Sequence, residues 1–171
     1  MFQFRISTFS FKNGISGLYQ FYFFFFIMAT VVIRMGGVIQ LVFKGIKTTP
    51  KKIFLVDDNR FFLESLVFLL NRQNDMDVVG THDRIQGVLE RIEAAKPDVI
   101  ILDMRLPDGD GIALLQEIKS NFDIPVIMLT MYEEHKERAI KTGAYAYLVK
   151  GEGLDRLYQL IRKATGAFVN S

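Results

Sequence analysis

The chain has 171 residues, of which 50% are apolar and 13% aromatic, and it contains no cysteine. This apolar fraction excludes a largely disordered chain, and the lack of cysteine excludes disulfides, thiolate metal sites and a cysteine nucleophile. The net charge of +2 conceals a division, because residues 1–52 hold seven Lys or Arg and no Asp or Glu. Residues 53–171 hold 14 basic and 19 acidic residues, a net charge of −5. We therefore expect two unlike segments that join near Lys51.

Residues 1–47 form a hydrophobic leader that is rich in phenylalanine. The 19 uncharged residues of the run 15–33 are enough to cross a bilayer as a helix, and five of the seven positive charges follow this run. One interpretation is an anchor that tethers a cytoplasmic protein to the inner face of the membrane. A second is spurious upstream translation, with Met28 or Met35 as the true start, and a third is a soluble extension. Residues 48–51 are expected to be a polar linker.

From residue 52 the sequence alternates between two patterns. Short apolar runs predict buried strands at 53–56, 77–81, 99–102, 125–129 and 144–149. Apolar residues at helical spacing predict helices at 60–70, 85–96, 112–118, 132–142 and 154–164. The pairs Phe61-Phe62 and Leu69-Leu70 are predicted to lie in the core. Alternating strands and helices indicate an α/β fold, a parallel sheet with helices on both faces, and we predict one such domain over residues 52–168.

Polar residues follow four of the predicted strands, and parallel strands end at the same edge of a sheet. These residues are Asp57, Asp58, Asp103, Thr130 and Lys150. Each alone is common in turns and helix caps, so it is their joint occurrence that points to a site. Three close carboxylates repel one another unless a cation lies among them, and oxygen ligands without Cys or His favour Mg²⁺ or Mn²⁺. A carboxylate can accept a phosphoryl group, and Asp103 is the best candidate because its strand is central.

These residues lie within motifs that identify a family. The segments IFLVDDN, VIILDMRLPDGDG, PVIMLT and AYAYLVK occur in this order, and residues 52–165 resemble a response-regulator receiver domain of two-component signalling, the CheY-like family. The segment AYLVKGE is similar to the corresponding segment in receivers of the NarL/FixJ helix-turn-helix group. The resemblance implies a flavodoxin-like (βα)5 doubly wound sheet with strand order 2-1-3-4-5.

The resemblance also implies roles for individual residues. Asp103 would take a phosphoryl group from a sensor histidine kinase or a phosphotransfer protein. Asp58 and Asp103 would bind Mg²⁺ together with the Met104 backbone carbonyl, and Asp57 would act mostly through water. Thr130 and Lys150 would contact the phosphate, and Tyr147 would be the aromatic switch residue. The face made by the helix at 132–142, the strand at 144–149 and the last helix would then change shape for an output partner.

Several positions depart from the family pattern. Gly151 stands where many members have proline after a cis bond, so we expect a trans bond here. Met131 is bulkier than the usual small residue, which predicts slower dephosphorylation. Arg105 and Tyr132 occupy positions that flank the attacking water in the family and tune the lifetime of the phosphorylated form.

Two other functions stay open. One is an Mg²⁺-dependent phosphohydrolase with an Asp nucleophile, although such enzymes want a second Asp where Arg105 stands. The other is a receiver-like interaction module that is not phosphorylated, although the complete set of site residues argues against it. His82 and His135 are too isolated to bind a metal. The chain ends six residues after Thr165, so we expect no direct binding to nucleic acid, and the protein acts either through partners or as a truncated DNA-binding regulator. A homodimer also stays open.

Overall fold

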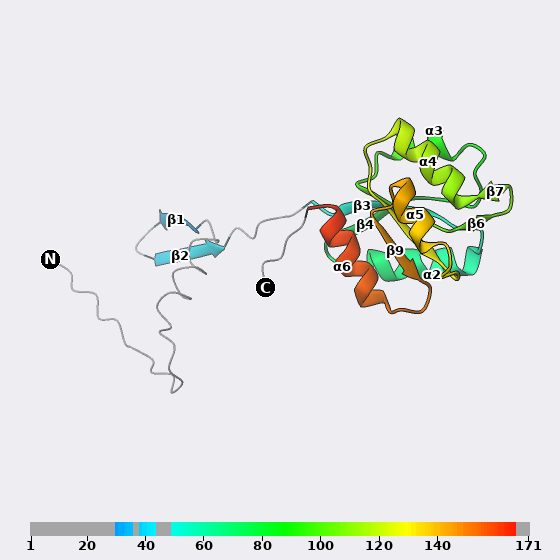
Figure 1. Ribbon diagram of the computed structural model, residues 1–171. Helices are drawn as coiled ribbons and strands as arrows, with labels where there is room; N and C mark the ends of the chain where they lie inside the picture. Colours follow the sequence, from blue (N-terminus) through cyan, green and yellow to red (C-terminus); the bar gives the residue numbers. More distant parts are fainter. Residues whose placement is uncertain (1–29, 36–37, 44–48, 167–171) are drawn as a thin grey trace. The chain divides into compact units, whose positions relative to one another are not determined.

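The computed structural model describes residues 30–35, 38–43 and 49–166 (Figure 1). The chain divides into two units, residues 1–47 and 48–171. In the first unit, β1 (Thr30–Met35) and β2 (Val38–Phe43) pair antiparallel. Most of the apolar run 15–33 lies outside the described residues, and its last four residues belong to β1 rather than to a helix. Among the residues that the structure describes, no helix is long and apolar enough to cross a membrane.

The second unit is built on a five-stranded parallel sheet. Its strand order is β4-β3-β5-β8-β9, which is the predicted order 2-1-3-4-5 when only these strands are counted. The inner strands are continuous apolar runs, as expected for strands that are covered on both faces. The strands are β3 (Lys51–Val56), β4 (Met76–His82), β5 (Val99–Leu102), β8 (Val126–Thr130) and β9 (Ala146–Val149).

Helices cover both faces of this sheet, which confirms the predicted α/β class (Figure 1). They are α2 (Arg60–Asn71), α3 (Val88–Ala95), α4 (Gly111–Asn121), α5 (Lys136–Thr142) and α6 (Leu154–Ala164). One core cluster joins the sheet to α2 and α6, and the other joins it to α3, α4 and α5. Successive strand side chains alternate between these clusters, since Ile53 and Leu55 belong to one and Phe54 and Val56 to the other.

The structure differs from the sequence-based prediction in several places. The helix predicted from residue 85 begins at Val88. The charged helix begins at Lys136 instead of residue 132, so Tyr132 belongs to a loop. A small antiparallel pair, β6 (Arg105–Leu106) and β7 (Gly109–Asp110), forms after β5 and was not predicted. The placement of Phe61 in the core is wrong, because the residue is 83% exposed. The buried stripe of α2 consists of Leu63, Leu66 and Leu70, and Phe61 lies off this stripe.

Candidate functional site

The three candidate carboxylates lie together at the carboxyl edge of the sheet. Asp57 and Asp58 follow β3, and Asp103 follows the neighbouring strand β5. Each of the three offers a carboxylate oxygen within 4.8 Å of the others. Asp57 and Asp103 are buried, whereas Asp58 is exposed. The three carboxylates offer only oxygen ligands, which hard cations such as Mg²⁺ and Mn²⁺ prefer.

Lys150 follows β9 and reaches across the sheet edge into this acidic cluster. Its Nζ lies 2.6 Å from Asp57 Oδ2 and 2.9 Å from Asp103 Oδ2, and its side chain is only 11% exposed. Burial raises the pKa of Asp57, and the hydrogen bonds from Lys150 and from the Asn59 backbone N–H oppose this rise only in part. Burial also lowers the pKa of Lys150, but the two carboxylates outweigh it and the net shift is upward. The lysine is therefore a firmly protonated cation between two acidic groups.

The backbone around Asp103 holds its carboxylate in one orientation. The Met104 N–H donates a 2.7 Å hydrogen bond to Asp103 Oδ1, and the Met104 carbonyl accepts one of 2.7 Å from the Gly111 N–H. A Cβ at Gly111 would lie 2.1 Å from the Asp103 carbonyl oxygen, so the first residue of α4 must be glycine. This close approach packs the N-terminus of α4 directly against the backbone of Asp103 and Met104.

Thr130 lies on β8 and Tyr147 on β9, the two strands that come after β5 in the order of the sheet. Thr130 is fully buried at the end of β8, and its Oγ1 has no hydrogen-bond partner among the described residues. Tyr147 is 6% exposed, and its hydroxyl donates to the backbone carbonyl of Tyr132. Burial raises the pKa of Tyr147, and the negative charges of Glu134 and Asp103 add to the rise, so the hydroxyl keeps its proton.

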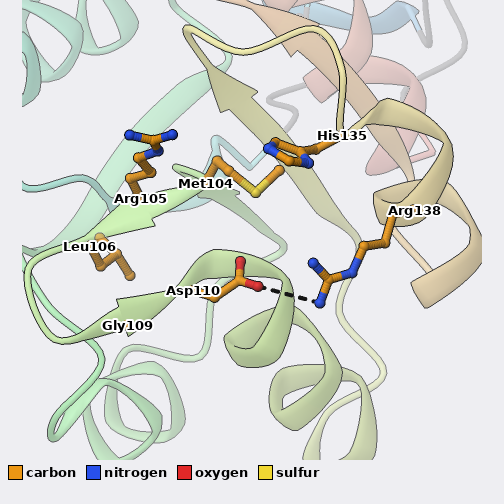
Figure 2. Close-up of a pocket in the computed structure, with 7 residues that line it drawn as sticks. All are labelled: Met104, Arg105, Leu106, Gly109, Asp110, His135 and Arg138. Carbon is orange, nitrogen blue, oxygen red and sulfur yellow. Dashed lines mark ion pairs between the residues drawn. The ribbon is translucent and has the colours of Figure 1, made fainter.

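The candidate lifetime-tuning residues lie at the solvent side of the site. The Arg105 guanidinium stacks on the Tyr132 ring, with Cζ 4.0 Å from the ring centroid. Met131 is 66% exposed. Figure 2 shows a hollow beside this region, bordered by the β6–β7 hairpin and by His135 and Arg138, in which Arg138 pairs with Asp110 at 3.4 Å.

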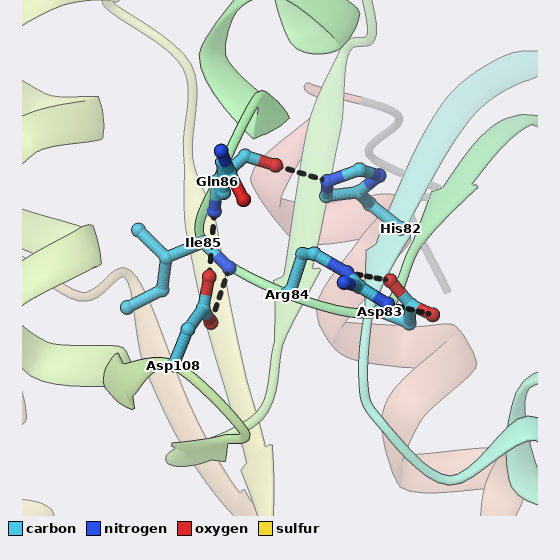
Figure 3. A network of polar contacts seen from close by, with 6 residues as sticks. All are labelled: His82, Asp83, Arg84, Ile85, Gln86 and Asp108. Atoms are coloured by element: carbon cyan, nitrogen blue, oxygen red, sulfur yellow. Dashed lines mark hydrogen bonds and ion pairs between the residues drawn. The ribbon is translucent and has the colours of Figure 1, made fainter.

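The loop after Asp103 is tied to the loop after β4, as Figure 3 shows. Both carboxylate oxygens of Asp108 accept backbone hydrogen bonds, from Ile85 N–H at 2.7 Å and from Gln86 N–H at 2.8 Å. These two bonds lower the pKa of Asp108. On the far side of the same loop, His82 Nε2 lies 2.8 Å from the Gln86 carbonyl oxygen. The segment after Asp103 is thus held at two points, at Met104 by Gly111 and at the turn between β6 and β7 by Asp108.

Comparison with known proteins identifies the family of this fold and site. A family model described as "Response regulator receiver domain" matches residues 53–162, well over half of the chain. The chain belongs to this family. The receiver is 42% identical over 102 residues to the DNA-binding transcriptional activator DevR/DosR of Mycobacterium tuberculosis, covering 58% of this chain and 47% of that protein. It is 32% identical over 117 residues to the response regulator protein VraR of Staphylococcus saprophyticus, covering 67% of this chain and 56% of that protein.

Solved receiver domains have the same fold. The BeF3-activated receiver domain of Klebsiella pneumoniae RstA is 28% identical with a TM-score of 0.63, covering 67% of this chain and 97% of that one. The response regulator domain of Thermotoga maritima CheB gives 28% identity and a TM-score of 0.64, covering 68% of this chain and 97% of that one. The chain spans about half the length of the curated relatives it matches. These findings confirm the family and the fold, and similarity to a DNA-binding activator agrees with the predicted likeness to helix-turn-helix regulators.

Two residues that shape the receiver site were not predicted from the sequence. Phe62 places its ring beneath Lys150, with Nζ 4.4 Å from the ring centroid, although the sequence pattern assigned it only to the core. Gly111 is the last residue of the motif VIILDMRLPDGDG, but nothing in that motif indicates its contact with the Asp103 backbone. The bond before Gly151 is trans, as expected, since the described residues contain no cis peptide bond.

Proposed function

We propose that Asp103 of this receiver is the phosphoacceptor of a two-component phosphorelay and that the domain is a signalling switch. The observation that supports this best is the convergence of four strand ends on one small region. There an acidic cluster, the Lys150 ammonium and the buried Thr130 hydroxyl come together. The phosphoryl donor is a phosphohistidine on a sensor histidine kinase or a phosphotransfer protein. The reaction takes place in the cytoplasm.

The acidic cluster is suited to hold a divalent cation during this reaction. Asp58, Asp103 and the Met104 carbonyl would bind Mg²⁺ or Mn²⁺ directly, and Asp57 would bind it mostly through water. The ion, when bound, supplies positive charge against the phosphoryl oxygens. The Met104 carbonyl has two lone pairs, and its hydrogen bond from Gly111 uses only one of them.

The transfer itself needs a nucleophile, a cation and a leaving group. A carboxylate oxygen of Asp103 attacks phosphorus, an O–P bond forms and the N–P bond of the phosphohistidine breaks. The imidazole leaves with the bonding electron pair and takes up a proton. Lys150 already lies 2.9 Å from Asp103 Oδ2, so its ammonium can follow the new phosphoryl oxygens with a small movement.

The switch follows from the two residues beside the acceptor. The Thr130 hydroxyl, which has no partner among the described residues, would donate a hydrogen bond to a phosphoryl oxygen. Movement of Thr130 would displace Tyr147. The Tyr147 hydroxyl donates a hydrogen bond to the Tyr132 carbonyl, so the loop that contains Tyr132 would move with it. The α5–β9–α6 face would then present a changed surface to an output partner, which includes a second copy of the receiver as one candidate.

One experiment tests the proposal. The purified chain is incubated with acetyl phosphate and Mg²⁺, and its intact mass is followed, with Asp103→Asn as the control variant. A phosphoryl adduct on the wild type that is absent from Asp103→Asn is the expected result. Rapid release of phosphate without an adduct would instead support the phosphohydrolase, and neither adduct nor turnover would support an interaction module that is not phosphorylated.

A further inference from the structure

We infer that Phe62 is a positioning residue for Lys150 and thereby for phosphoryl transfer to Asp103, an inference that rests on the proposed function. Phe62 is half-buried in the first turn of α2, and its ring lies 4.4 Å from the Lys150 Nζ. An ammonium over an aromatic face at this distance is held by attraction to the ring electrons, and the attraction is larger where water is excluded. The Lys150 side chain is 11% exposed, so the contact lies in such a place.

The Lys150 ammonium has two kinds of partner, carboxylates and an aromatic ring. Lysine has three N–H donors and a flexible four-carbon chain, so two hydrogen bonds alone leave it free to pivot. Here the ammonium forms an ion pair with Asp57 at 2.6 Å and a hydrogen bond of 2.9 Å with Asp103, and the Phe62 ring lies close to the same nitrogen. The ring therefore limits the pivoting that would carry the ammonium away from Asp103.

The start of α2 fixes this ring relative to the acidic cluster. The Asn59 side chain accepts a 3.1 Å hydrogen bond from the Phe62 N–H, which caps the helix. The Asn59 N–H in turn donates a 2.9 Å bond to Asp57 Oδ1. One residue, Asn59, thus links the carboxylate and the aromatic ring that Lys150 touches. The arrangement is preorganised, which matters because a group that is already in place does not have to be ordered during the reaction.

The ring has its effect when Lys150 must leave Asp57. A cation bound by the acidic cluster competes with the ammonium for Asp57, and the phosphoryl group attracts the ammonium toward Asp103. During this change the ion pair with Asp57 is lost, whereas the aromatic contact can be kept. Phe62 thereby favours the Lys150 position that serves Asp103 over positions that point to solvent.

The test compares Phe62→Leu, which removes the ring but keeps an apolar side chain, with Phe62→Tyr, which keeps the ring. Phe68→Leu is the matched control, because Phe68 is on the same helix and 61% exposed. The rate of adduct formation from acetyl phosphate should fall about 3- to 30-fold in Phe62→Leu and stay close to wild type in the other two variants. Urea unfolding establishes that each variant is folded.

Two further measurements separate positioning from a general effect on the fold. In a Lys150→Met background, Phe62→Leu should cause no additional loss of rate. In NMR spectra, the Lys150 Hε protons should show a ring-current shift that persists in Phe62→Tyr and disappears in Phe62→Leu. The inference would be overturned if the wild type forms the adduct and Phe62→Leu forms it at the same rate. It would also be overturned if Phe62→Leu slows adduct formation equally in the wild-type and Lys150→Met backgrounds. Failure of the wild type to form an adduct would count against the proposed function instead.

Discussion

The Lys150 ammonium lies 2.6 Å from Asp57 Oδ2, and the two side chains are only 11% and 6% exposed. Because the same nitrogen also contacts Asp103, one cation balances part of the charge of a cluster in which three carboxylates offer oxygens within 4.8 Å of one another. Any divalent ion bound there competes with this lysine for Asp57. The cluster thus contains an internal cation, the Lys150 ammonium, which a bound divalent ion would partly replace.

Lys150→Met should therefore separate ion binding from phosphoryl transfer. Removing the ammonium leaves the carboxylates less compensated, so we expect Mg²⁺ to bind about tenfold more tightly. The rate of modification by acetyl phosphate should fall about 100-fold, because a charge that stabilises the transition state is lost. Calorimetric titration with Mg²⁺ and intact mass measure the two effects. Lys141→Met, on a side chain that is 75% exposed, is the control, and weaker Mg²⁺ binding to Lys150→Met would contradict this picture.

Thr130→Val should stabilise the chain while it impairs the switch. The buried Thr130 hydroxyl has no partner among the described residues, and an unsatisfied buried polar group costs about 1 kcal/mol or more. Valine has nearly the same shape, so urea unfolding should show a gain of about 1 kcal/mol. Phosphorylation should still occur, but the amide shifts of α5 and β9 on modification should shrink. Thr142→Val serves for comparison, because Thr142 is only half-buried and its hydroxyl donates to the Arg138 carbonyl, and a loss of stability in Thr130→Val would refute the argument.

The strand-end residues were predictable because parallel topology determines where they lie. Once the alternation of strands and helices is recognised, Asp57, Asp103, Thr130 and Lys150 must end at the same edge of the sheet. The sequence could not show which neighbour on α2 meets Lys150. Phe61 and Phe62 are adjacent and equally apolar, and only the rotation of the helix, set by packing of its Leu63, Leu66 and Leu70 stripe, turns one ring to solvent and the other to the site.

Element boundaries failed where local signals were weak. The helix predicted from residue 132 begins at Lys136, and its cap residue His135 makes no side-chain capping bond. The β6–β7 hairpin after Asp103 is two residues long on each side, too short for an apolar pattern to reveal. The contact of Gly111 with the Asp103 backbone could not be predicted from the sequence either, because it depends on tertiary packing.

Gly111→Ala should disturb the loop that follows Asp103 more than the small size of the added methyl group suggests. The added methyl group would lie 2.1 Å from the Asp103 carbonyl oxygen and 2.9 Å from the Met104 carbonyl oxygen, so the loop or the start of α4 must move. We expect a loss of about 3 kcal/mol in stability by urea unfolding. Modification by acetyl phosphate should also slow, because the loop begins at Asp103, the proposed acceptor. Ser120→Ala, on the exposed side of the same helix, should change stability by less than about 0.5 kcal/mol. Wild-type stability in Gly111→Ala would show that the helix start is more adaptable than this geometry implies.

The ion pair between Asp75 and Arg162 should give the stability a dependence on acid pH. Arg162 donates two hydrogen bonds to Asp75, of 2.7 and 2.9 Å, and these lower the pKa of the Asp75 carboxyl below its usual 3.8. A lowered pKa means that the contribution is complete above the unfolded-state pKa and is lost as pH falls through the folded-state pKa.

Arg162→Gln should consequently cost about 1 kcal/mol at pH 7 and much less near pH 2. Urea unfolding across this pH range measures the difference. Lys141→Gln breaks the exposed Lys141–Glu137 pair, whose side chains are 75% and 83% exposed, and should have little effect at either pH. A cost for Arg162→Gln that does not change with pH would mean that the arginine acts through packing of its aliphatic chain.

Met131→Ala should shorten the lifetime of the phosphorylated chain. Met131 directly follows Thr130 and is 66% exposed, so its bulk lies on the solvent side of the site, where an attacking water must enter. Tyr132, the next residue, carries the Arg105 guanidinium on its ring, with Cζ 4.0 Å from the ring centroid. The half-life of the adduct after removal of acetyl phosphate should fall roughly 2- to 5-fold, a change in barrier of about 1 kcal/mol or less. Ile140→Ala, at another exposed apolar residue, should leave the half-life unchanged. An unaltered half-life in Met131→Ala would show that the bulk of Met131 does not limit the attack of water.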